Sequence, residues 1–161
     1  MGSLLSFWGA TGVLVLAGIT VHWTHVASKT YPYTISRPTS FRLAVVKDAT
    51  NTNVDYYFPP LGSRTTNVNI SAPFGTRARD EAAYLRSIGG RNVRNGPRMK
   101  LAGKIRTLCT AHFSGLVGPY TLEQTNFVAR SRVWWLTISY EDRYRGMRPL
   151  LEKMLRSFRL H

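Results

Sequence analysis

The feature that most constrains this chain is a long uncharged segment near its N-terminus. The twenty residues from Leu4 to Trp23 contain no Asp, Glu, Lys or Arg, and thirteen of them are apolar. A helix of that length measures about 30 Å, the thickness of a bilayer core. A helix of a soluble core rarely lacks a polar stripe over so many turns. The segment therefore predicts one transmembrane helix. Its expected anchoring residues are Leu4, Phe7, Trp8, Val13, Leu14, Leu16, Ile19 and Trp23.

A cleaved signal peptide is the competing interpretation of this segment. Val26-Ala27-Ser28 fits a small-residue cleavage site. However, the segment lacks the basic region that opens a signal peptide, and its apolar run is long for one. We therefore expect residues 1–28 to form a retained anchor with a short linker, and residues 29–161 to form one domain.

The composition indicates a folded, strongly basic domain. Hydrophobic residues make up 43% of the chain, which suits a packed core. The net charge of +14 implies an acidic partner surface, which could be protein, anionic lipid or nucleic acid. Cys109 is the sole cysteine, so the sequence excludes an internal disulfide and a cysteine-rich metal site.

Alternation of apolar and polar residues, together with turn residues, predicts a strand-rich domain. The expected strands cover residues 30–35, 41–46, 54–58, 66–70, 105–114, 120–129 and 132–140. The last of these is apolar on both faces, which predicts a central strand covered on both sides. Residues 91–106 are basic around Asn95-Gly96-Pro97, and we expect a loop or a hairpin tip there.

Two helices complete the predicted fold. The first covers residues 78–88, begins near Asp80-Glu81 and ends at Gly89-Gly90. The second closes the chain, with a single apolar stripe at helical spacing formed by Met147, Leu150, Leu151, Met154, Leu155 and Phe158. The sequence thus predicts an α+β fold in which helices pack on the faces of an antiparallel sheet.

The order of these elements resembles the PsbP-like domains. The segment Tyr33-Thr34-Ile35-Ser36-Arg37-Pro38-Thr39-Ser40-Phe41 is similar to the Y-x-I-x-x-P-x-x-F/W opening of that family. Residues 54–58 and 67–71 are similar to its second pair of strands, and residues 135–140 and 144–158 to its last strand and closing helix. The resemblance implies an α-β-α sandwich. It also implies a non-catalytic protein, since the best known members are extrinsic proteins on the lumenal face of photosystem II. This chain departs from them in its predicted anchor and in its high charge.

We find no residue pattern typical of an enzyme or of a cofactor site. The four histidines are not at metal-ligand spacing with another histidine, cysteine or carboxylate. The chain contains no G-x-S-x-G, P-loop or G-x-G-x-x-G motif. We therefore expect no catalytic residues, no metal and no cofactor.

The candidate site is a basic cluster that spans the predicted helix and the segment after it. No acidic residue occurs between Ala82 and Leu122. The stretch from Arg86 to Arg106 also contains no Phe, Tyr or Trp, which argues against nucleic acid. An acidic protein surface or anionic lipid remains as the expected partner. The residues expected to bind it are Arg86, Arg91, Arg94, Arg98, Lys100, Lys104 and Arg106.

These observations favour a non-catalytic accessory subunit of a multi-subunit energy-transducing membrane complex. We expect the mitochondrial respiratory chain, and hence the inner membrane, because the predicted anchor is N-terminal and the domain is Arg-rich. A photosystem-associated PsbP-like subunit of the thylakoid membrane is the close alternative. A membrane-tethered module for anionic lipid or nucleic acid is the second class. Expected partners are the acidic surfaces of neighbouring subunits and an anionic lipid such as cardiolipin, with the domain on the intermembrane-space or lumenal side.

Overall fold

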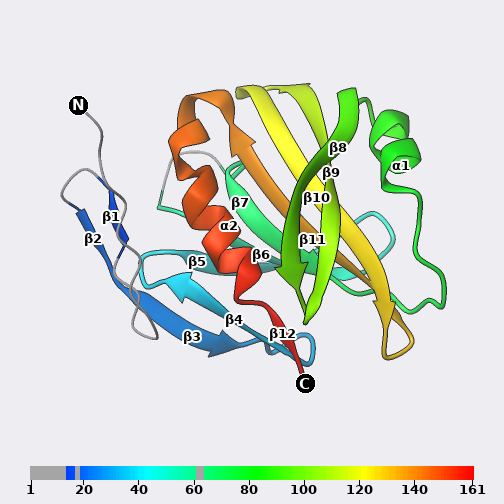
Figure 1. The fold of residues 1–161 in the computed structure, drawn as a ribbon, viewed down its shortest axis with the longest axis horizontal. Helices are drawn as coiled ribbons and strands as arrows, with labels where there is room; N and C mark the ends of the chain where they lie inside the picture. Colours follow the sequence, from blue (N-terminus) through cyan, green and yellow to red (C-terminus); the bar gives the residue numbers. More distant parts are fainter. Residues whose placement is uncertain (1–13, 17–18, 61–63) are drawn as a thin grey trace.

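The chain folds into a strand-rich α+β structure (Figure 1). The computed structural model describes residues 14–16, 19–60 and 64–161. Its largest element is a seven-stranded antiparallel sheet. In spatial order its strands are β5 (Arg42–Lys47), β6 (Asn53–Phe58), β7 (Asn67–Ser71), β11 (Arg132–Glu141), β10 (Gly118–Ala129), β9 (Lys104–Gly115) and β8 (Arg91–Leu101).

Smaller elements complete the fold. A three-stranded sheet has the order β12 (Arg159–Leu160), β4 (Tyr33–Pro38) and β3 (Trp23–Ala27). Strands β1 (Leu14–Leu16) and β2 (Ile19–Val21) pair with each other in antiparallel orientation. The helices are α1 (Glu81–Ser87) and α2 (Arg148–Arg156), and a 3₁₀ segment, η1 (Asp142–Met147), leads into α2. The described fold is richer in sheet than the expected α-β-α sandwich.

The predicted transmembrane helix is wrong over the part of the segment that is described. Leu14 and Leu16 lie in β1, Ile19 in β2 and Trp23 in β3. The other expected anchoring residues, Leu4, Phe7, Trp8 and Val13, lie outside the described residues. Among the described residues, no helix is long and apolar enough to cross a membrane.

The helix was predicted from the absence of charge, but exposed and half-buried residues alternate in this segment with a period of two. Thr20 and His22 are exposed, whereas Val21 and Trp23 are half-buried and pack against the main core. Such alternation is typical of a half-buried strand. The ammonium of Lys153 on α2 lies 4.5 Å from the centre of the Trp23 ring, so this segment is part of the folded domain.

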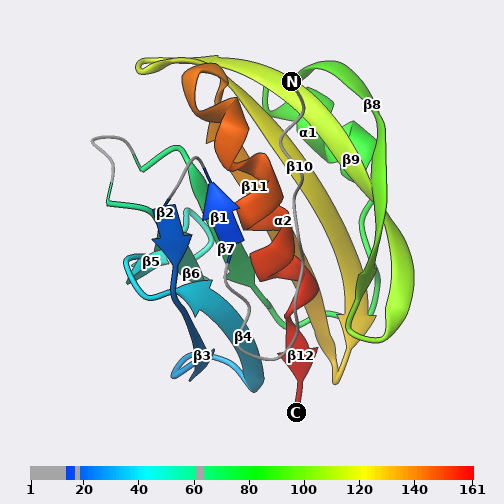
Figure 2. The same ribbon diagram turned by 60° about the vertical axis from the view of Figure 1, so that its left-hand side comes forward.

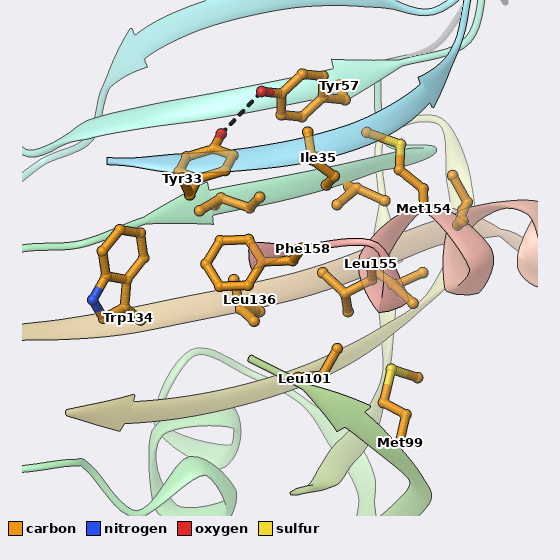
Figure 3. Close-up of a cluster of buried hydrophobic side chains, with 14 of the residues drawn as sticks. Tyr33, Ile35, Tyr57, Met99, Leu101, Trp134, Leu136, Met154, Leu155 and Phe158 are labelled. Atoms are coloured by element: carbon orange, nitrogen blue, oxygen red, sulfur yellow. Dashed lines mark hydrogen bonds between the residues drawn. The ribbon is translucent and has the colours of Figure 1, made fainter. Parts of the chain in front are cut away.

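The main core lies between the large sheet and a layer formed by α2 and the small sheet (Figure 2). The predicted stripe of the closing helix is confirmed: Leu151, Met154 and Leu155 are fully buried. Figure 3 shows Met154, Leu155 and Phe158 directed toward side chains of the large and small sheets. Trp134 of β11, also fully buried, contacts Phe158 edge-on with ring centres 5.6 Å apart.

The opposite face of the large sheet is covered only in part. Leu85 of α1 is fully buried against Cys109, Ala111 and Phe113 of β9. Asp80 caps this helix by accepting a hydrogen bond from the Ala83 backbone N–H. The helix is only seven residues long, so the face formed by β6, β7 and β11 remains open.

A buried hydrogen-bond network joins the small sheet to the large one. Asp55 of β6 accepts hydrogen bonds of 2.6 Å from the hydroxyls of Ser28 and Tyr33. The Tyr33 hydroxyl also lies 3.0 Å from that of Tyr57 (Figure 3). Burial raises the pKa of Tyr57 to about 12, and burial also raises the pKa of Tyr33. Both phenols are therefore held in their neutral form.

This network predicts a loss of stability in alkali. Tyr57 ionises near its ordinary pKa of about 10 when unfolded but near 12 when folded, so stability declines as pH rises from about 10 to 12. The shift corresponds to about 2–3 kcal/mol. Urea unfolding at pH 9 and pH 11 should show about half of this decline, and Tyr57→Phe should show a smaller one. An equal decline in both proteins would contradict the assignment.

The closing helix predicts a second effect on stability. Leu151→Ala removes a fully buried side chain and should lower the free energy of unfolding by about 2–5 kcal/mol. Leu43→Ala on the edge strand β5 is the control, because Leu43 is 41% exposed and should cost less than about 1 kcal/mol. Equal losses in urea unfolding would show that the core lies elsewhere.

Candidate interaction surface

The basic segment predicted as a loop or hairpin tip is instead an edge strand with an irregular register. Strand β8 runs from Arg91 to Leu101 and pairs with β9. Its register shifts twice, between Arg91 and Arg94 and between Asn95 and Arg98, and Gly96-Pro97 lies at the second shift. An edge strand tolerates proline, since its outer side needs no ladder donor. A Cβ at Gly96 would lie 2.1 Å from the Thr110 hydroxyl, so the close approach to β9 requires glycine.

Four of the predicted partner-binding residues line this strand and are exposed. We call Arg91, Arg94, Arg98 and Lys100 the basic edge. Arg94 pairs with Thr110 and Arg98 with Thr107, residues that point to opposite faces of the sheet because their separation along β9 is odd. The shift in register therefore distributes positive charge over both sides of the edge.

Of the three other residues predicted to bind the partner, two are exposed and one is half-buried. Arg86 lies on α1 and Lys104 begins β9, both at the surface. Arg106 is half-buried, with its guanidinium carbon 3.6 Å from the centre of the Phe127 ring. Burial lowers the pKa of Arg106. Its position over Phe127 indicates a packing role, whereas its predicted role in partner binding stays a prediction.

The positive charge of the edge is not neutralised within the described chain. The ion pairs among the described residues all lie away from the edge. They join Arg143 to Glu141, Arg145 to Asp142, and Arg148 to Glu123 and Glu152. Among the described residues, no carboxylate lies within ion-pairing distance of the basic edge. Its cations are thus free to meet an acidic surface.

A second surface feature, a cleft, escaped the sequence analysis. It has a volume of about 520 Å³ and lies on the open face of the large sheet, beside α1. Tyr84 of α1 and Trp135 of β11 stand together in it, with ring centres 5.1 Å apart. Trp135 is half-buried, so the predicted cover on both faces of β11 is only partial. The cleft draws on β6, β7, β10, β11 and α1, which are distant in sequence.

The floor of the cleft carries a buried amide. Gln124 is 5% exposed and accepts a hydrogen bond of 3.2 Å from the Thr137 hydroxyl. Its Nε2 has no hydrogen-bond partner among the residues that the structure describes. Burial also raises the pKa of Tyr56 on the cleft wall. The volume lies in the usual range of small-molecule pockets, but the lining is largely polar and includes Asp48, Asn69 and Arg79.

Comparison with known proteins identifies the fold. No protein-family model matches the chain, and no curated protein matches it. The structure is similar to the solution structure of cyanobacterial PsbP (CyanoP) from Synechocystis sp. PCC 6803, with a TM-score of 0.53. The match has 16% sequence identity and covers 90% of this chain and 95% of that chain. The protein therefore has a PsbP-like fold, and this part of the prediction is confirmed.

The half-buried arginine of β9 and the exposed arginines of β8 should differ in how much their replacement by alanine lowers stability. Arg106→Ala should lower the free energy of unfolding by about 1 kcal/mol, because it removes a cation over Phe127 and the packing of its stem. Arg98→Ala, at an exposed position of the paired strand, should change it by less than about 0.5 kcal/mol. Urea unfolding measures both, and a costlier Arg98→Ala would reverse the assignment.

Proposed function

We propose that this chain is a non-catalytic accessory subunit that docks, through its basic edge, on an acidic surface of a photosystem-associated membrane complex. The observation that carries the proposal is the basic edge itself, a rigid strand of exposed cations without partners among the described residues. A flexible loop would lose conformational freedom on docking, whereas a strand already paired with β9 loses little.

The likeness to cyanobacterial PsbP supports a photosystem-associated complex, rather than the mitochondrial respiratory chain, as the partner assembly. The respiratory-chain hypothesis depended on an N-terminal helical anchor, and the described part of that segment forms strands. The PsbP-like fold favours the alternative hypothesis of a photosystem-associated subunit. We therefore propose a photosystem association for this chain. On the same grounds we propose the thylakoid membrane, with the domain on the lumenal side.

Charge complementarity supports an acidic protein surface as the partner. The full chain carries +14, and the basic edge concentrates part of that charge along one border of the sheet. Such complementarity chiefly accelerates and orients association, so binding should weaken as salt screens the charges. Nucleic acid is disfavoured because no aromatic side chain occurs between Arg86 and Arg106 to stack on bases.

The proposal predicts that reversing the edge charges releases the protein from its complex. The triple variant Arg94→Glu, Arg98→Glu and Lys100→Glu should stay folded and leave the high-mass photosystem band on native gels of thylakoid membranes. The wild-type chain should migrate with that band at low salt and leave it at high salt. The control is Arg42→Glu with Lys47→Glu on β5, the opposite border of the sheet, which should migrate like the wild type.

Two results would contradict the proposal. Migration of the wild-type chain near its own mass under mild extraction would argue against a subunit. Retention of the triple variant in the complex, at the wild-type level, would argue against docking through the basic edge. Unfolding of the variant is excluded separately by its circular dichroism spectrum and its urea midpoint.

A further inference from the structure

The turn between β9 and β10 presents two apolar side chains at the end of a hairpin. Gly115 pairs with Gly118, and Leu116 and Val117 lie between them. The side chain of Leu116 is fully exposed, and Val117 is 46% exposed. Two-residue hairpin turns are usually made of Gly, Asn or Asp, which are polar or small. The backbone requires only Gly118, whose φ is +108°, so Leu and Val are not dictated by the turn.

The hairpin beneath these residues is rigid. Phe113 of β9 and Tyr120 of β10 pair directly, and their rings stack 5.2 Å apart at an interplanar angle of 12°. Tyr120 pairs in turn with Glu141 at the end of β11. Phe113 also packs in the cluster under α1. The apolar tip is thus held in a fixed position at one end of the sheet (Figure 1).

Basic side chains occur on both sides of this end. Arg91 pairs with His112 on β9, and Arg86 follows Leu85, which packs against Phe113. On the other side, η1 continues directly from Glu141 and carries Arg143 and Arg145, which are 59% and 73% exposed. The nearby carboxylates are Glu141, which is buried and paired with Arg143, and Asp142, which lies 4.0 Å from the exposed Arg145. We call Arg86, Arg91, Arg143 and Arg145 the basic collar.

We propose that the turn is a membrane-insertion tip, in which Leu116 and Val117 enter an anionic bilayer while the basic collar binds lipid phosphates. Two convex apolar residues are far too small for a specific protein interface, which buries about 800 Å² on each partner. A bilayer accepts an apolar tip without a complementary pocket. Its anionic headgroups complement the collar.

This inference goes beyond the proposed docking on an acidic subunit and does not require it. The tip lies at the end of the β9–β10 hairpin, whereas Arg94, Arg98 and Lys100 lie along β8; Arg91 belongs to both surfaces, and the docking variant leaves it unchanged. The docking variant that reverses these three charges should therefore retain tip-dependent membrane binding. Failure of one proposal leaves the other testable.

The test is flotation of the purified full chain with vesicles. The wild-type protein should float with vesicles of phosphatidylcholine and phosphatidylglycerol, and much less with phosphatidylcholine alone. Leu116→Ser with Val117→Ser should lower partitioning roughly tenfold. Ile105→Ser is the matched control, because Ile105 is 66% exposed elsewhere on β9 and should change partitioning less than about twofold.

A second readout places the tip in the membrane directly. An environment-sensitive dye on Leu116→Cys should shift to the blue on anionic vesicles, whereas the dye on Ile105→Cys should not; native Cys109 is buried. Absence of flotation, or flotation unaffected by the double serine variant with no dye shift, would overturn the proposal. Equal binding to both vesicle types would overturn the role of the basic collar.

Discussion

The fold depends on the burial of one apolar stripe of α2 between two sheets. Leu151, Met154 and Leu155 pack against the large sheet on one side and the small sheet on the other. Because the closing helix and β12 come last in the chain, the small sheet and the core are completed only when the C-terminus is in place. The buried Asp55 network then fixes the small sheet to β6. These contacts use one face of the large sheet, so its other face and its two borders remain for function.

In the proposed function, the cations of β8 serve structure and association together. An edge strand exposes unpaired backbone groups and invites pairing with another chain, and lysine or arginine on the edge opposes this. The same charges are those that we propose to dock on an acidic partner. The apolar tip of β9–β10 adds a different kind of contact at one end of the same sheet. A protein held through both the basic edge and the hairpin tip would have a fixed orientation relative to the membrane, because the two contacts lie at different places on the sheet.

Local patterns in the sequence predicted much of the fold, and non-local features escaped them. The meander β9–β10–β11 and the closing helix were predicted within a few residues, because their periodicity and turn residues are local. Strand β8 was missed because Asn95-Gly96-Pro97 is typical of a turn, and only the neighbouring β9 stabilises an irregular register there. The N-terminal helix was predicted from missing charge, although Thr20 and His22 already alternated with Val21 and Trp23. Arg106 could not be separated from its neighbours without knowing that Phe127 lies under it.

The most direct measurement of the central claim is zero-length cross-linking of lysines to carboxylates in intact thylakoid membranes, followed by mass spectrometry. Such a reagent joins an ammonium only to a carboxylate in contact with it. Docking through the basic edge predicts cross-links from Lys100 of β8, and from Lys104 just beyond the hairpin turn, to aspartates or glutamates of one photosystem-associated subunit. Cross-links confined to Lys47 on the opposite border, with none from Lys100 or Lys104, would contradict it.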